Sequence, residues 1–382
     1  MLEYIDGAIL EAIEKARTLK TKIPGAANLF PDFEALVVKA ETEIDSLIGY
    51  LMHIYESTDY QNPDNLRQKI LQYQRIVGSL SILENVVIAA IARSHKDDEY
   101  VNRLVRAICR EINYPLQKPI ASCLSQKYYH IYPDYGLLCI PLLEADFLLH
   151  IADIYHELVH PLIELDNPKL ERFKQELGSF NVIVKQFFGK EIERVERNSS
   201  RKDFIDMLHL WSDCWIEKWS VEFFCDLFGL YTLGPAYAWS NYHLCVKIST
   251  DVFETPLFAV TSHPPDDARM QVLFHALELM GYGVERQKIG LKWNEYINIM
   301  QFKKHAEYAY AVPDTLLEQI AVSAFEATKT ISCHIATEGE QGAISKMLND
   351  AWLEFWKEPV AFPEWERKTV KKFKSSLVAQ HN

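Results

Sequence analysis

Residues 146–160 read DFLLHIADIYHELVH, and apolar side chains recur along them at the spacing of a helix. The apolar stripe consists of Phe147, Ile151, Ile154, Tyr155 and Leu158. The polar residues that fall mostly on the opposite side are Asp153, His156, Glu157 and His160. This pattern predicts one helix from Asp146 to His160, with one side in the core and a cluster of titratable groups on the other.

The HELVH segment at the end of this stretch has two histidines four residues apart, His156 and His160. On a helix, side chains at this spacing have Cβ atoms about 5 to 6 Å apart, so both imidazoles can bind one metal ion. A catalytic zinc ion has three protein ligands and an open fourth position for water, and Glu157 is placed to take a proton from that water. The alternative is a helix whose histidines only cap or pack.

A third ligand is expected from the strongly apolar helix predicted over residues 204–231. Glu222 is flanked there by Val221 and Phe223, and a carboxylate among apolar side chains is costly unless a cation compensates its charge. We therefore expect Glu222 to bind the zinc ion, rather than to lie at the surface or in a salt bridge. On a helix, Glu217 points about 140° away from Glu222 and cannot face the same ion.

Asp226 follows Glu222 by one helical turn and lies on the same side of the predicted helix. A carboxylate in this place can accept the outer N–H of a histidine ligand, which fixes the tautomer and the orientation of the ring. The expected role of Asp226 is therefore to orient a ligand rather than to bind the ion.

Three motifs occur in a fixed order: HELVH at 156–160, EFFCD at 222–226 and SHPPDDAR at 262–269. Together they resemble the motifs of gluzincin metallopeptidases similar to the CAAX prenyl proteases and heat-shock membrane proteases, and of their soluble relatives. The resemblance covers roughly residues 125–282. It implies zinc bound by His156, His160 and Glu222, with Glu157 as general base and Asp226 orienting a ligand.

The SHPPDDAR motif adds two site residues through the same resemblance. It implies that His263 helps to stabilise an oxyanion and that Arg269 braces the site. Taken alone, a histidine before two prolines is more often a loop residue, and an arginine in the first turn of a helix more often faces solvent.

Aromatic and β-favouring residues replace the helical pattern over residues 128–143, which read YYHIYPDYGLLCIPLL. Pro133, Asp134 and Gly136 interrupt this run and predict a turn. A short hairpin or an edge strand is expected here. As an edge strand, YGLLCI at 135–140 would pair with a peptide substrate by strand addition; the alternative is a buried hairpin.

The chain divides by pattern into three regions. Residues 1–118 and 285–382 are predicted to be helical, and residues 119–284 carry the motifs and the predicted strands. The predicted fold is α+β and mostly helical, with a zincin-like core in which a small antiparallel sheet packs on the HELVH helix.

The composition limits the class of protein. The 53 acidic against 40 basic residues give a formal charge of −13, which argues against binding to nucleic acid. The seven cysteines show no CxxC pair, which is typical of reduced thiols in a cytoplasmic protein. The N-terminus lacks a basic, apolar leader, and charged residues interrupt the apolar stretch before HELVH, so we expect neither a signal peptide nor a membrane span.

The sequence therefore predicts a cytoplasmic zinc metalloendopeptidase of the gluzincin type that acts on a peptide or protein substrate. In a second hypothesis the chain is a catalytically silent zinc-binding scaffold, whose helical flanks bind a protein partner and cover the cleft. In a third hypothesis it binds no metal and is a helical protein-interaction module.

Overall fold

The computed structural model describes residues 2–24, 31–61, 65–93, 96–125, 128–141, 144, 147–198 and 202–379. The chain forms two compact units. The first comprises Met1–Val105 and Pro119–Leu142, and the second comprises Arg106–Lys118 and Leu143–Asn382. The predicted α+β, mostly helical class is confirmed, because helices dominate and three short strands form one small sheet.

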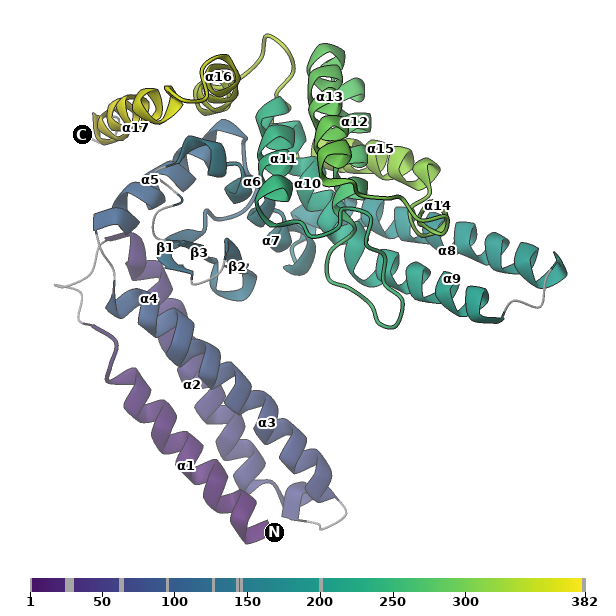
Figure 1. The fold of residues 1–382 in the computed structure, drawn as a ribbon. Coiled ribbons are helices and arrows are strands. Elements are labelled where there is room, and N and C mark those ends of the chain that lie inside the picture. The colour runs from purple at the N-terminus through teal and green to yellow at the C-terminus, as the bar shows by residue number, and fades with distance from the viewer. Residues whose placement is uncertain are drawn as a thin grey trace. The chain divides into compact units, whose positions relative to one another are not determined.

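The first unit contains the N-terminal helices, and the first three of them lie lengthwise beside one another (Figure 1). The N-terminal helices are α1 (Leu2–Lys20), α2 (Glu34–Glu56), α3 (Leu66–Ile82), a π-helical turn (Leu83–Ile88), α4 (Ala89–Ala92) and α5 (Lys96–Glu111), the last of which continues into the second unit. Apolar residues at helical spacing, such as Ile9, Leu51 and Leu80, are buried between α1, α2 and α3. The ammonium of Lys69 is wholly buried within this group and pairs with Asp6.

The sheet of the first unit consists of β1 (Ile120–Ser125), β2 (His130–Tyr132) and β3 (Leu137–Pro141) in the order β1-β3-β2. The β2–β3 pair is the predicted hairpin, with Gly136 in the left-handed region at φ +59°. The prediction of an antiparallel sheet is wrong for the other pair, because β1 runs parallel to β3.

The prediction that YGLLCI forms an exposed edge strand is also wrong. Strand β3 lies in the middle of the sheet with a partner on each side, so it has no free edge for a peptide. Residues Leu137 to Ile140 are all buried, as is typical of a central strand with a continuous apolar sequence. The alternative of a buried hairpin describes this segment. The sheet belongs to the first unit and HELVH to the second, so the packing of one on the other stays a prediction.

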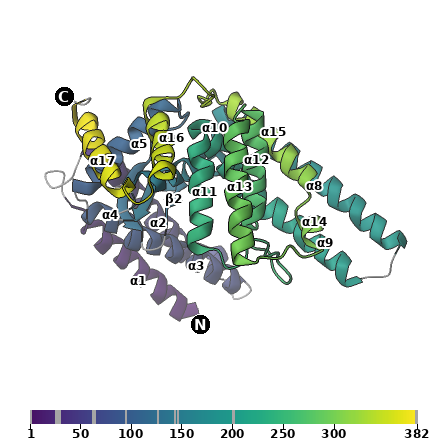
Figure 2. The same ribbon diagram turned by 45° about the horizontal axis from the view of Figure 1, so that its top comes forward.

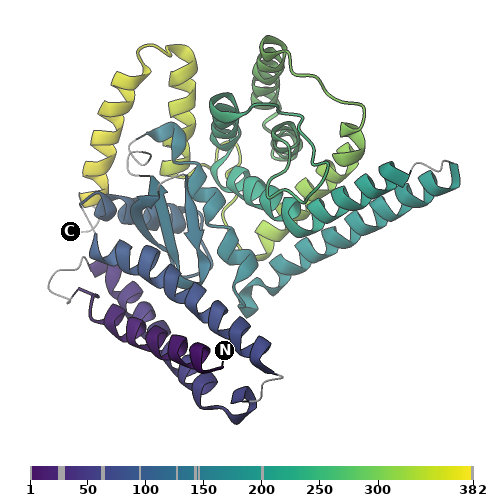
Figure 3. The same cartoon turned by 60° about the horizontal axis from the view of Figure 1, so that its bottom comes forward.

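The second unit is all-helical in its described residues and is built around α10 (Ser220–Leu233), which packs against α6, α8, α11, α12 and α15. Helices α11, α12 and α13 pack against one another (Figure 2), and α8 and α9 form a long antiparallel pair (Figure 3). The remaining helices are α6 (Asp153–Glu157), α7 (His160–Glu164), α8 (Glu171–Asn198), α9 (Lys202–Cys214), a π-helical turn (Trp215–Trp219), α11 (Pro235–Ile248), α12 (Asp266–Leu279), α13 (Gly283–Met300), α14 (Tyr308–Ala311), α15 (Asp314–Thr330), α16 (Ala343–Lys357) and α17 (Phe362–Ala379).

The single helix predicted over 146–160 is wrong. The chain forms a 3-10 turn at Leu148–His150, then α6, then α7, and Asp146 lies outside the described residues. Pro161 explains the break, because it has no N–H to donate to the carbonyl of Glu157 and its ring would clash with that carbonyl in a continuous helix. The two histidines of HELVH therefore belong to two short helices.

The compact units differ from the three predicted regions. The strands within 119–142 group with the N-terminal helices, and the helices after residue 285 group with the HELVH region. Helix α15 shows why, because it buries its apolar side against α8, α10 and α12. The C-terminal helices are thus part of the core around the motifs rather than a separate flank.

One helical run in the described part of the chain, Leu66–Ala92, is long and apolar enough to cross a membrane. In its most apolar 18-residue window, 39% of the residues are buried inside the protein. Length and composition do not separate a membrane span from a core helix. The expectation that the chain crosses no membrane stays a prediction.

Candidate metal centre

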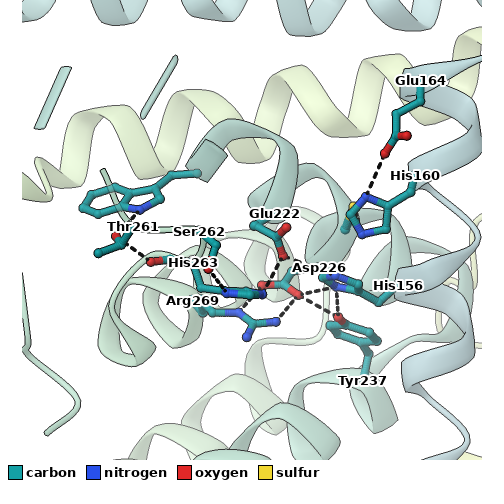
Figure 4. A network of polar contacts seen from close by, with 12 residues as sticks. His156, His160, Glu164, Glu222, Asp226, Tyr237, Thr261, Ser262, His263 and Arg269 are labelled. Carbon is teal, nitrogen blue, oxygen red and sulfur yellow. Dashed lines mark hydrogen bonds and ion pairs between the residues drawn. The ribbon is translucent and has the colours of Figure 1, made fainter. Parts of the chain in front are cut away.

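The ring of His156 is held through its Nδ1 atom (Figure 4). This atom lies 3.0 Å from Oδ1 of Asp226 and 3.2 Å from the hydroxyl of Tyr237, which itself donates to Asp226 Oδ1 at 2.7 Å. A metal ion that displaces the proton from Nε2 would leave the proton on Nδ1 directed at the carboxylate. Burial lowers the pKa of His156, but the hydrogen bond to Asp226 and the nearby carboxylate of Glu222 outweigh burial and raise this pKa to about 10.

Asp226 in turn is held by Arg269, which lies near the start of α12. The guanidinium makes two hydrogen bonds to the carboxylate, each of 2.7 Å, and Asp226 is fully buried. Burial alone would raise the pKa of Asp226, but the charge and hydrogen bonds of Arg269 hold it well below its usual range. Arg269 is therefore not a solvent-facing residue; its side chain is 11% exposed.

Glu222 lies on the other side of His156. Its Oε2 atom is 3.4 Å from His156 Nε2 and 3.5 Å from His263 Nε2, yet among the described residues it has no hydrogen-bond partner of good geometry. Burial raises the pKa of Glu222, but the interaction with the nearby His156 outweighs burial and lowers this pKa below the usual range. Glu217, which the helix geometry excludes, is exposed on the π-helical turn.

His160 and Cys225 bring a further donor to the site. The Sγ atom of Cys225 lies 3.8 Å from Nε2 of His160. The ligand atoms of His156, His160 and Cys225 all lie within 4.8 Å of one another, and this is the one such group of three in the described residues. The Glu222 carboxylate, which the resemblance implies as third ligand, is next to His156 but is not a member of this compact group.

Glu157 and His263 complete the surroundings. Glu157 is buried at the end of α6, and together with other nearby carboxylates its charge adds to the effect of burial in raising the pKa of Cys225. His263 lies in the loop before α12 with its side chain 60% exposed, and its Nδ1 is 2.8 Å from the Ser262 hydroxyl. The loop is held by Trp219, whose indole N–H donates to Thr261 at 3.1 Å.

The sequence reasoning missed two residues of this site, Cys225 and Tyr237. The cysteine count predicts only a reduced thiol at Cys225, although this residue follows Glu222 by three positions and so lies on the same side of α10. Tyr237 had no signal in the sequence, because it reaches Asp226 from the next helix. Its ring lies against Gly229, where an added Cβ would be 2.3 Å from the ring.

Comparisons with protein-family profiles, curated proteins and solved structures found no match to this chain. The gluzincin resemblance therefore rests on the three motifs alone. The geometry brings together residues from all three: His156 and His160, then Glu222 and Asp226, then His263 and Arg269.

Proposed function

We propose that the chain is a zinc-dependent peptidase whose ion is bound by His156, His160 and Glu222. The observation that carries this proposal is the orientation of His156, whose Nδ1 faces the Asp226–Arg269 pair and whose Nε2 faces Glu222. The buried Oε2 of Glu222, which lacks a good hydrogen bond, is an acceptor that a cation would satisfy. The donor set of two imidazoles and a carboxylate suits zinc.

Zinc bound in this place would polarise a peptide carbonyl and lower the pKa of a water molecule to about 7. The residues of the chain have separate roles. Glu157 takes the proton of the attacking water and passes it to the leaving amine. His263, exposed beside Glu222, donates a hydrogen bond to the oxygen on which negative charge develops. Arg269 keeps Asp226 ionised, so that His156 stays oriented.

A second candidate function is metal binding without turnover. It is favoured by Cys225, because a thiol 3.8 Å from His160 offers a fourth protein donor to the same ion. For either function we propose that the chain is located in the cytoplasm. We also propose that the helices outside the motif region bind a protein partner.

Substitution of Glu157 by glutamine tests the peptidase. Glutamine has nearly the same shape but cannot accept the proton, so Glu157→Gln is expected to retain zinc and thermal stability and to hydrolyse casein about 10² to 10⁴ times more slowly. Zinc content, melting temperature and rate are measured on one preparation of each protein. A variant that cleaves casein at the wild-type rate would contradict the assigned role. Protein that binds no zinc at all would favour the helical interaction module.

A further inference from the structure

Four donor atoms lie at this site: Nε2 of His156, Nε2 of His160, Oε2 of Glu222 and Sγ of Cys225. The distances between them can be compared with those between the ligand atoms of a tetrahedral zinc ion. With Zn–N distances of about 2.0 to 2.1 Å and Zn–S distances of about 2.3 Å, neighbouring ligand atoms of a tetrahedral site are about 3.4 to 3.6 Å apart. The distance from His156 Nε2 to Glu222 Oε2 is 3.4 Å, and that from His160 Nε2 to Cys225 Sγ is 3.8 Å. Each histidine thus has a second donor at nearly the distance between two ligands of one ion. Cys225 belongs with both histidines to the compact donor group, whereas Glu222 lies outside it and must move closer to complete one shell.

These two donors come from the same helix. Glu222 and Cys225 are three residues apart on α10, so their side chains lie on one side of it. Helices α6 and α7, which carry the two histidines, both pack against α10. The four donors are therefore placed by the packing of one helix against two short ones.

We propose that Cys225 Sγ is a ligand of the ion, in addition to His156, His160 and Glu222. This inference rests on the proposed zinc site. Ligation replaces the S–H proton of Cys225 by the ion, and the proton is released to solvent. Four protein donors fill a tetrahedral shell, so the position that a catalytic water requires is occupied by sulfur. The wild-type site then admits water only when Cys225 leaves the ion, so the wild type hydrolyses peptide at a rate that this ligand limits.

The consequence is an unusual response to removal of a ligand. Loss of Glu222 leaves a site without its carboxylate, whereas loss of Cys225 leaves the two histidines, the carboxylate and an open position. Cys225→Ala is therefore expected to retain zinc and to hydrolyse peptide faster than the wild type. Cys245→Ser is the matched control, because Cys245 is also buried in the second unit but belongs to no such donor group among the described residues.

X-ray absorption at the zinc edge of the full chain loaded with zinc tests this directly. The wild type and Cys245→Ser are expected to show a sulfur neighbour at about 2.3 Å beside nitrogen and oxygen at about 2.0 to 2.1 Å. Cys225→Ala and Cys225→Ser are expected to lose the sulfur neighbour. A wild-type spectrum without sulfur, or sulfur that persists in both Cys225 variants, would overturn the inference.

The same proteins separate this inference from the peptidase proposal. Glu157-dependent hydrolysis by a wild type whose zinc has no sulfur neighbour would leave the peptidase standing and remove Cys225 from the ligand shell. A sulfur neighbour in a chain that hydrolyses nothing, even as Cys225→Ala, would support the ligand and refute the peptidase. Failure of the wild type to bind zinc would refute both.

Discussion

His156 is oriented by residues from three separate segments of the chain. Asp226 of α10 and Tyr237 of α11 face its Nδ1, and the positive charge of Arg269 of α12 compensates the negative charge of Asp226. An imidazole held in this way presents one nitrogen in a constant direction, which lowers the entropy lost when a metal ion binds. At the scale of the residue, the candidate site is therefore a histidine with a rigid support.

Glu222 and Glu217 lie on the same helical run, Trp215–Leu233, but Glu222 faces His156 and Glu217 faces solvent. Their alanine variants therefore form a matched pair. Glu222→Ala is expected to lower zinc occupancy strongly, because the carboxylate is buried 3.4 Å from His156 Nε2. Glu217→Ala is expected to leave it unchanged, because Glu217 is exposed. Zinc is measured by elemental analysis after dialysis. Equal occupancy in the two variants would remove Glu222 from the site.

Asp226→Asn tests the support of His156. The amide keeps the shape of the side chain but not its charge, so zinc affinity is expected to fall by about 10- to 100-fold. Competition with a chromogenic chelator measures the dissociation constant. Tyr237→Phe is the milder comparison, since it removes only the hydroxyl that donates to Asp226. Complete loss of zinc from Asp226→Asn would indicate that Asp226 binds the ion itself.

Helix α10 carries the site by being almost wholly buried. Every described residue from Phe223 to Leu233 is buried, and the helix has neighbours on all sides. It is continuous with α9 through the π-helical turn Trp215–Trp219. A π-helical turn adds a residue to the helix and rotates everything that follows it. The side on which Glu222, Cys225 and Asp226 meet the histidines is thus set partly by this turn.

Gly229→Ala tests the approach of α11 to α10. The new Cβ would lie 2.3 Å from the ring of Tyr237, so the ring must move and the unfolding free energy is expected to fall by about 1 to 3 kcal/mol. Gly178→Ala is the control, because this helical glycine on α8 has nothing within 4 Å of the added Cβ. It is expected to stabilise the chain by about 0.5 to 1 kcal/mol. Urea denaturation measures both, and a neutral Gly229→Ala would show that Tyr237 is free to relocate.

At the scale of the whole molecule, the second unit joins segments that are far apart in the sequence. Glu366 of α17 accepts a hydrogen bond of 2.7 Å from the backbone N–H of Leu148, just before α6. Glu111 of α5 accepts hydrogen bonds of 2.8 Å from the N–H groups of Ile344 and Ser345 at the start of α16. These contacts tie the C-terminal helices to the segments that surround the candidate site.

The Glu366 contact predicts a pH dependence of stability. Burial raises the pKa of Glu366 above its unfolded value of about 4.3. A carboxyl group with a raised folded pKa contributes stability that is present below the unfolded pKa and is lost as the pH rises through the folded one. Glu366→Gln stays neutral, so its unfolding free energy relative to the wild type is expected to increase between pH of about 4 and about 7. Urea denaturation at the two pH values measures this difference, and a difference that does not change with pH would contradict the assignment.

The sequence alone determined the features that depend on local spacing. The predicted α+β, mostly helical class is confirmed. It could be predicted because apolar residues recur every 3.6 residues in a helix and every second residue in a strand. The shared side of Glu222 and Asp226, the exposure of Glu217, the turn at Gly136 and the start of α11 at Pro235 follow from such short-range rules. The break between α6 and α7 was also readable in the sequence, since Pro161 directly follows HELVH.

Only the tertiary structure decided which distant segments meet. It placed β3 between two neighbours, brought Cys225 to 3.8 Å from His160, and set Tyr237 against Asp226. It also directed Arg269 inward, with its side chain only 11% exposed, although a place near the start of a helix suggested that it faces solvent. These contacts join residues of different helices and strands, so the spacing of apolar residues within one helix or strand does not predict them. They follow from how helices and strands pack once their apolar sides are buried together, which is a property of the assembled chain.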